Sequence, residues 1–223
     1  MEEESDKVPA SLPKVGLTTS QTSVPEKVQH IWCSVEISKK MEDVLIGWIL
    51  QQAQNNVGIT EYVVYLSTTG GNPFASISLY NFIKSIPQKT TVYNMGTVAS
   101  AGVPFFLGFE SRVGVPDCSF MVHQTAMSKS SLPENITVFE MDTQKTNLEA
   151  TDDKSQKIIV KETASHGTEN LTAATIKSAF LKTTYYDANE AQKLGFIDKI
   201  ELPNIPGTGV LYLTDQYLAT LPG

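Results

Sequence analysis

The feature that most constrains this chain is an alternation of short strand and helix patterns that begins near residue 30. Residues 30–37 (HIWCSVEI) are rich in Ile, Trp and Val and predict a strand, and residues 61–67 (EYVVYLS) predict a strand that is covered on both faces. Between them, apolar side chains recur at helical spacing at Met41, Val44, Leu45, Trp48 and Ile49. Strands that alternate with helices favour an α/β architecture with a largely parallel sheet.

The alternation continues to about residue 201 and sets the predicted domain limits. We expect a helix over 74–83, a strand at 91–94 that ends in a turn at Gly96, a short helix from about residue 100, and strands at 112–115 and 119–122. Residues 1–28 hold three prolines among polar residues and predict a mobile N-terminal arm. One domain therefore covers 29–201, and residues 202–223 form a C-terminal tail with a candidate strand at 210–213.

One region, about residues 133–167, stands apart because it contains no internal proline or glycine. Val138, Met141, Lys145 and Leu148 keep a helical 3-4-3 spacing there, and three of these four side chains are apolar. A single helix here would be about 50 Å long, more than a domain of this size needs, and its apolar stripe would require a partner. Two shorter helices that break near Asp152 and Asp153 fit the pattern equally well.

Charge and composition exclude several functional classes. Lys and Arg number 17 against 24 Asp and Glu, a net charge of −7, whereas proteins that bind nucleic acid or anionic membranes carry a basic face. No apolar run approaches the roughly 20 residues of a membrane-spanning helix. The acidic N-terminus is unlike a secretory signal, which predicts a cytoplasmic protein. With two cysteines and three histidines, we expect buried thiols and neither a metal site nor a cofactor.

Three local features carry candidate chemistry. Gly70 and Gly71 follow a predicted buried strand, where a glycine pair can turn the backbone and present bare N–H groups. Ser100 lies among small residues at a strand-to-helix turn, and His123 ends an apolar strand 23 residues later. Taken singly, these features also fit an ordinary turn, a helix N-cap and a core histidine.

In this order, the features resemble the proteolytic subunits of the Clp protease (ClpP). The 29-residue spacing from Gly71 to Ser100, the His123-Gln124 pair, and the segment 185–198 (YYDANEAQKLGFID) all match that family's pattern. The resemblance covers about residues 30–201 and implies a ClpP/crotonase-like α/β fold, a superhelix of ββα units. It identifies the region of about 133–167 with the family's protruding handle helix, which joins two rings face to face.

The resemblance also implies the chemistry. Ser100 would be the nucleophile, His123 the general base, and the backbone N–H groups of Gly71 and Ala101 the oxyanion hole. The protein would be a serine peptidase that cleaves unfolded proteins or peptides without metal or cofactor, assembled into homo-oligomeric rings that can stack. Because the sequence has no Gly-x-x-x-x-Gly-Lys-Ser/Thr loop, an AAA+ ATPase partner would be a separate protein.

Departures from the family pattern keep alternatives open. The family's third catalytic residue is an aspartate seven residues before Glu190, where this chain has Thr183. A threonine hydroxyl can orient an imidazole but supplies no charge, and we interpret nearby Asp187 as a helix cap. Thr125 replaces a proline after His123-Gln124, in a loop that pairs with substrate in the family. A weakly active or non-catalytic ring subunit, and a crotonase-type acyl-CoA enzyme, are therefore alternatives.

Overall fold

The computed structural model describes residues 27–55, 58–126 and 135–221. The predicted N-terminal arm, 1–28, lies outside them apart from its last two residues, which begin the first strand. In chain order the elements are β1 (Lys27–Ser34), α1 (Lys39–Asn55), β2 (Ile59–Thr68), α2 (Pro73–Ser85), β3 (Lys89–Ala99), α3 (Gly102–Leu107), β4 (Ser111–Gly114), β5 (Ser119–Val122), α4 (Val138–Thr163), α5 (Ala173–Lys182), β6 (Thr184–Asp187), α6 (Ala188–Lys193), β7 (Lys199–Ile200), β8 (Val210–Thr214) and α7 (Asp215–Thr220).

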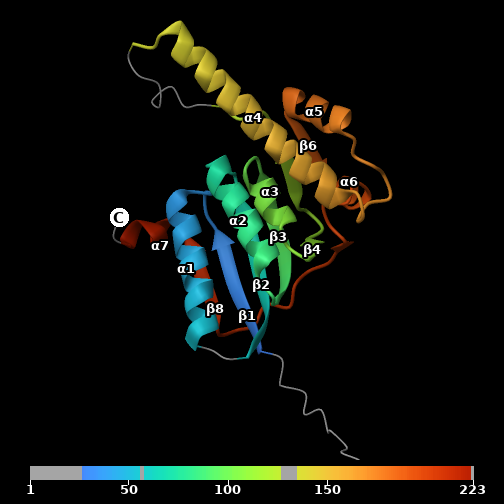
Figure 1. Cartoon of the computed structure of the whole chain (residues 1–223). Coiled ribbons are helices and arrows are strands. Elements are labelled where there is room, and N and C mark those ends of the chain that lie inside the picture. The colour runs from blue at the N-terminus through green and yellow to red at the C-terminus, as the bar shows by residue number, and fades with distance from the viewer. Residues whose placement is uncertain (1–26, 56–57, 127–134, 222–223) are drawn as a thin grey trace, which may run out of the picture.

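A mixed sheet forms the centre of the α/β fold, as the sequence predicts. Its main path runs β6-β5-β3-β2-β1-β8, and β4 pairs with both β3 and β7. The strands pair in parallel except for β6, which runs antiparallel to β5. Helices α1, α2 and α3 lie side by side on one face of the sheet (Figure 1). The carboxyl ends of β2, β3 and β5 lead into the three candidate segments found in the sequence.

Local sequence explains where the helix after the Gly-Gly loop begins. The side chain of Asn72 accepts hydrogen bonds from the amides of Phe74 and Ala75, at 2.9 and 3.2 Å, and Pro73 occupies the first helical position. A capping asparagine followed by proline is a strong helix start. Helix α2 therefore begins two residues after Gly71, which fixes one end of the glycine loop.

Strand β3 corrects the prediction of a turn at Gly96. The strand continues to Ala99, pairing first with β4 through residues 91–94 and then with β5 through residues 97–99. Asn94 lies where β3 changes its partner strand from β4 to β5. Its side chain accepts from the amide of Gly96 at 3.1 Å and donates to the carbonyl of Ser119 at 2.8 Å. The glycine thus lies at an irregularity within one strand, and β3 carries Ser100 at its end.

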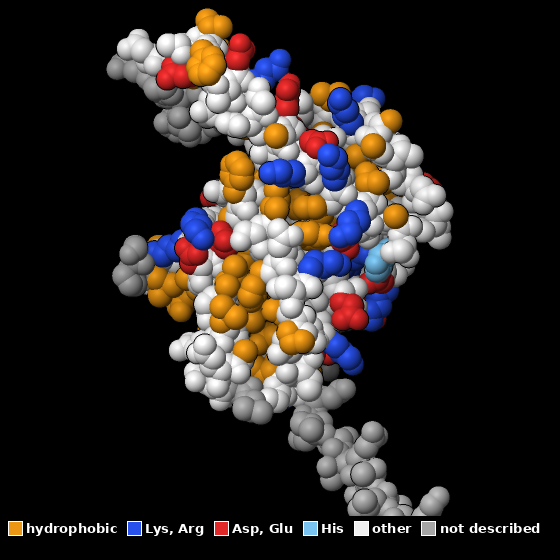
Figure 2. Space-filling model, in the orientation of Figure 1, with side chains coloured by type: hydrophobic (Ala, Val, Ile, Leu, Met, Phe, Trp, Pro, Cys, Tyr) orange, Lys and Arg blue, Asp and Glu red, His pale blue; other side chains and the backbone are white. Residues whose placement is uncertain are grey.

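Helix α4 is a single helix of 26 residues, so the alternative of a break near Asp152 and Asp153 is wrong. It begins with a capping box between Thr137 and Glu140. The helix projects from the body of the molecule (Figure 1). Hydrophobic side chains gather at its free end (Figure 2), where Val138 and Phe139 are 76% and 79% exposed.

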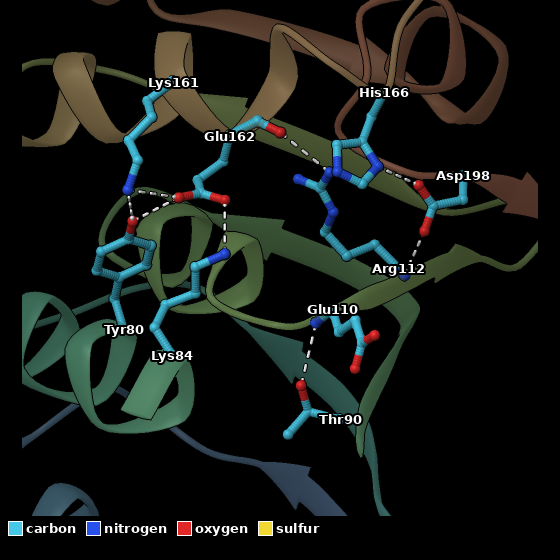
Figure 3. Close-up of polar contacts among 9 residues, drawn as sticks. All are labelled: Tyr80, Lys84, Thr90, Glu110, Arg112, Lys161, Glu162, His166 and Asp198. Atoms are coloured by element: carbon cyan, nitrogen blue, oxygen red, sulfur yellow. Dashed lines mark hydrogen bonds and ion pairs between the residues drawn. The ribbon is translucent and has the colours of Figure 1, made fainter. Parts of the chain in front are cut away.

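The base of α4 is fixed to the body by buried polar contacts (Figure 3). Glu162, 8% exposed, accepts from the hydroxyl of Tyr80 at 2.5 Å and from Nζ of Lys84 at 2.9 Å, both on α2. Its backbone carbonyl accepts from Nη2 of the buried Arg112 on β4 at 3.0 Å. A cation at the C-terminal end of a helix is favourable because the free carbonyls there carry partial negative charge.

The C-terminal residues assigned to the tail take part in the sheet. Strand β8, which contains the candidate strand 210–213, pairs in parallel with β1, and α7 follows it. Both cysteines are buried and unpaired, as expected, and burial raises the pKa of Cys33 to about 12 and that of Cys118 to about 11. Within the described ranges, no helix is long and apolar enough to cross a membrane.

Candidate active site

Ser100 lies at the sharp turn between β3 and α3. Its backbone has a φ of 55°, a left-handed conformation that is unusual for a residue other than glycine. Its amide donates to the carbonyl of Met121 at 2.7 Å, and Ala101 rather than Ser100 is the N-cap of α3. The hydroxyl is therefore not used for capping. A strained residue held by its surroundings is typical of functional sites.

The imidazole of His123 meets this hydroxyl. His123 directly follows β5, which lies between β3 and β6, so the end of the strand is fixed on both sides. Nε2 of His123 lies 2.8 Å from Oγ of Ser100. The contact that the sequence predicts between these two side chains is present, and it has the distance that proton transfer requires.

The Gly70–Gly71 loop lies beside Ser100 and is held by Ile37. The carbonyl of Gly70 accepts from the amide of Ile37, and the amide of Asn72 donates to the carbonyl of Ile37, both at 2.7 Å. Ile37 and Gly71 form an isolated parallel bridge, in which Ile37 bonds to Gly70 and Asn72, the two neighbours of Gly71. The amide of Gly71 is therefore not used by this pairing. The φ of Gly71, +133°, requires glycine.

A cavity of about 250 Å³ joins these groups. Its lining includes Gly71, Ser100, Ala101 and His123 from the catalytic candidates, and it is completed by Thr69, Pro73, Thr125, Ala126, Ser155 and Phe180. Among the described residues, the amides of Gly71 and Ala101 donate no hydrogen bond. The cavity thus places a hydroxyl, an imidazole and two free N–H groups around one space, which is the set of groups that acyl transfer uses.

Comparison with known proteins assigns the family. Residues 19–203 match the profile of the Clp protease family. This chain belongs to the Clp protease family. Among curated relatives, the ATP-dependent Clp protease proteolytic subunit 3 of Rhodococcus jostii is 24% identical over 142 residues, which is 63% of this chain and 65% of that protein. Subunit 2 of Treponema denticola is 24% identical over 167 residues, 74% of this chain and 78% of that protein.

Two further comparisons bear on extent and fold. Subunit 1 of Streptomyces avermitilis is 26% identical over 144 residues, 63% of this chain and 61% of that protein. The chain thus spans less than two thirds of the Rhodococcus and Streptomyces relatives. Among solved structures, a mutant of ClpP1 from Listeria monocytogenes has a TM-score of 0.65 at 19% identity, covering 78% of this chain and 91% of that chain. This similarity establishes the ClpP/crotonase-like fold.

Thr183, the possible third catalytic residue predicted from the sequence, is not joined to the Ser100–His123 pair. It is the exposed C-cap of α5, and no hydrogen bond links it to His123 in the described part of the chain. Asp187 caps α6 as the sequence predicts: its side chain accepts from the amide of Glu190 at 2.9 Å. Neither residue therefore orients the imidazole in this structure.

Thr183 has a backbone conformation that predicts a gain in stability on substitution. Its φ is 53°, which a β-branched side chain adopts at a cost, whereas glycine adopts it freely. Thr183→Gly should raise the free energy of unfolding by about 0.5–1 kcal/mol, measured by chemical denaturation. Lys182→Gly is the control: inside the last turn of α5 it should lower stability. Equal losses in both variants would contradict the expectation.

Sequence reasoning missed one contact at the edge of this site. Asp152, on α4, is 7% exposed, and its Oδ1 accepts from both the amide and the hydroxyl of Thr125, at 2.8 and 2.7 Å. The sequence contained one relevant signal: Thr125, which the resemblance places at a proline of the Clp family, has an N–H group that can donate. The partner could not be found because it lies 27 residues away on another element.

Proposed function

We propose that this protein is a ClpP-like serine endopeptidase that cleaves unfolded proteins or peptides through an acyl-enzyme. The observation that carries the proposal is the 2.8 Å contact between Oγ of Ser100 and Nε2 of His123 inside a cavity that two free amides line. A nucleophile in hydrogen-bond contact with a base, next to preorganised donors, is the geometric signature of this chemistry. The relatives named as proteolytic subunits support the same class of reaction.

The proposed mechanism follows from the geometry. With its proton on Nδ1, His123 accepts the hydroxyl proton of Ser100 at Nε2 while Oγ attacks the scissile carbonyl. The resulting oxyanion is stabilised by the amides of Gly71 and Ala101, and donors of this kind typically contribute about 3–4 kcal/mol each to the transition state. His123 then protonates the leaving amine, and water hydrolyses the acyl-enzyme by the reverse sequence. No metal or cofactor takes part.

A second candidate is a weakly active or non-catalytic ring subunit of a ClpP-like assembly. The position of Thr183 favours it, because no carboxylate of the described residues is hydrogen-bonded to the imidazole of His123. An uncompensated imidazolium is less stable in the transition state, so the rate constant should be lower than with an aspartate present. The two candidates differ in reactivity at Ser100 and share the same architecture.

Assembly and partners form part of the proposal. The exposed hydrophobic end of α4, with Val138, Phe139 and Met141, is suited to contact a second copy, and homo-oligomeric rings that stack through α4 would cover it. Curated relatives are subunits of an ATP-dependent protease, which supports a separate AAA+ ATPase as partner. We also propose a cytoplasmic location.

A fluorophosphonate probe tests the function, because the serine oxygen displaces fluoride from phosphorus only where a base accepts its proton. We expect the assembled protein to be labelled at Ser100, as mapped by mass spectrometry of its peptides. The Ser100→Ala and His123→Ala variants should not be labelled. Ser85 is an exposed serine at the end of α2, and the Ser85→Ala variant should be labelled like the wild type. An assembled wild type that remains unlabelled would favour the non-catalytic subunit.

A further inference from the structure

The backbone on the C-terminal side of His123 is held by a single buried carboxylate. Thr125 lies two residues after His123, and both its amide and its hydroxyl donate to Oδ1 of Asp152, at 2.8 and 2.7 Å. Hydrogen bonds to an ionised acceptor are stronger and more directional than neutral ones. Asp152 therefore ties the end of the β5 segment to α4.

Asp152 lies on a buried part of α4. It is 7% exposed, and its neighbour one turn along, Ser155, is also buried and lines the same cavity as Ser100. Below this point, α4 is anchored by the contacts of Glu162 with α2. Because the helix is fixed at its base, the carboxylate is a fixed point for Thr125 to bind.

The imidazole of His123 has little other support. Within the described residues its ring is hydrogen-bonded to Ser100 alone, and Thr183 and Asp187 make other contacts. The orientation of the ring therefore depends on the backbone before and after it. On the N-terminal side, the pairing of β5 with β3 and β6 fixes the backbone. On the C-terminal side, the contact between Asp152 and Thr125 fixes it.

We propose that Asp152 is a positioning residue for the peptidase reaction: through Thr125 it holds the segment that keeps His123 on Ser100. This inference rests on the proposed function. The residue acts through hydrogen-bond geometry and does not touch the reacting atoms. A displacement of about 1 Å in a catalytic group can lower a rate about 100-fold, so loss of this contact should be visible in the reactivity of Ser100.

The test compares the rate constant of fluorophosphonate labelling in four assembled variants. Asp152→Ala removes the acceptor and should slow labelling about 100-fold. Asp152→Asn keeps an oxygen that accepts from Thr125 and should restore most of the rate, which a purely electrostatic role would not allow. Asp153→Ala is the matched control, because this neighbouring exposed aspartate pairs with Lys157 and not with the site. Thr125→Val removes only the hydroxyl donor and should give a smaller loss than Asp152→Ala.

A crystal structure of the Asp152→Ala protein separates this proposal from the proposed function. We expect the Nε2–Oγ distance between His123 and Ser100 to exceed hydrogen-bond length in that variant and to be retained in Asp152→Asn. An unlabelled wild type with a displaced His123 in Asp152→Ala would overturn the peptidase and support the positioning role. A retained 2.8 Å contact, or labelling of Asp152→Ala at the wild-type rate, would overturn the positioning role. If Asp152→Ala fails to assemble, Thr125→Val decides, and wild-type labelling by it would overturn the proposal.

Discussion

Replacing Gly70 with alanine should abolish the reaction of Ser100 and destabilise the protein. A Cβ atom at Gly70 would lie 2.6 Å from Cβ of Ser100 and 2.8 Å from the carbonyl oxygen of Ala99, closer than such atoms approach in proteins. The φ of Gly70, +103°, adds backbone strain. Because Ser100 is itself in a strained turn between β3 and α3, the clash must move the nucleophile or the Gly71 amide beside it.

Two measurements check this result. The free energy of unfolding should fall by about 3–5 kcal/mol, and fluorophosphonate labelling of the assembled protein should fall by at least about 100-fold. Gly58→Ala is the matched control, since Gly58 has a similar φ of +120° but nothing within 4 Å of the added Cβ. That variant carries the backbone strain without the clash. Labelling of Gly70→Ala at the rate of Gly58→Ala would show that the glycine loop does not set the position of Ser100.

The parts of this fold that depend on local sequence could be predicted. The alternation of strands and helices follows from side-chain periodicity, and the cap at Asp187 follows from the capping-box pattern. The candidate site could be predicted because the order and spacing of the Gly-Gly loop, Ser100 and His123 resemble the pattern of the Clp family. In the structure, the neighbouring strands β2, β3 and β5 bring these residues to one cavity.

The remaining features depend on contacts that the sequence does not display. Strand β3 runs through Gly96 because Asn94 binds a carbonyl on β5, which replaces the partner lost when β4 ends. Helix α4 runs through Asp152 because the buried carboxylate there is satisfied by Thr125. A pair of aspartates in a helix otherwise predicts a break or an exposed face. In each case a tertiary hydrogen bond outweighs the local preference.

Loss of the Glu162 carboxylate should produce the second large effect, and this effect should depend on pH. Burial alone would raise the pKa of Glu162, but hydrogen bonds from Tyr80, Lys84 and Lys161 outweigh burial and lower it from 4.5 to about 2. A carboxyl group with a depressed pKa in the folded state stabilises the protein above its unfolded pKa, and this stability is lost as the pH falls toward the folded pKa. The contribution of Glu162 is therefore complete above about pH 5 and disappears between pH 4.5 and about 2.

Glu162→Gln should accordingly lower the free energy of unfolding by about 2–3 kcal/mol at pH 7, and by progressively less as the pH approaches 2, where the carboxyl of the wild type is itself protonated (Figure 3). Denaturant unfolding of both proteins across this range measures the difference. Glu149→Gln is the matched control on the same helix, because its exposed pairing with Lys145 at 3.8 Å should contribute less than about 0.5 kcal/mol. A constant difference between wild type and Glu162→Gln at every pH would mean that Glu162 fixes the base of α4 by packing rather than by its charge. The expected convergence at low pH would instead locate the anchor of α4 in the ionised carboxylate and the groups that donate to it from α2.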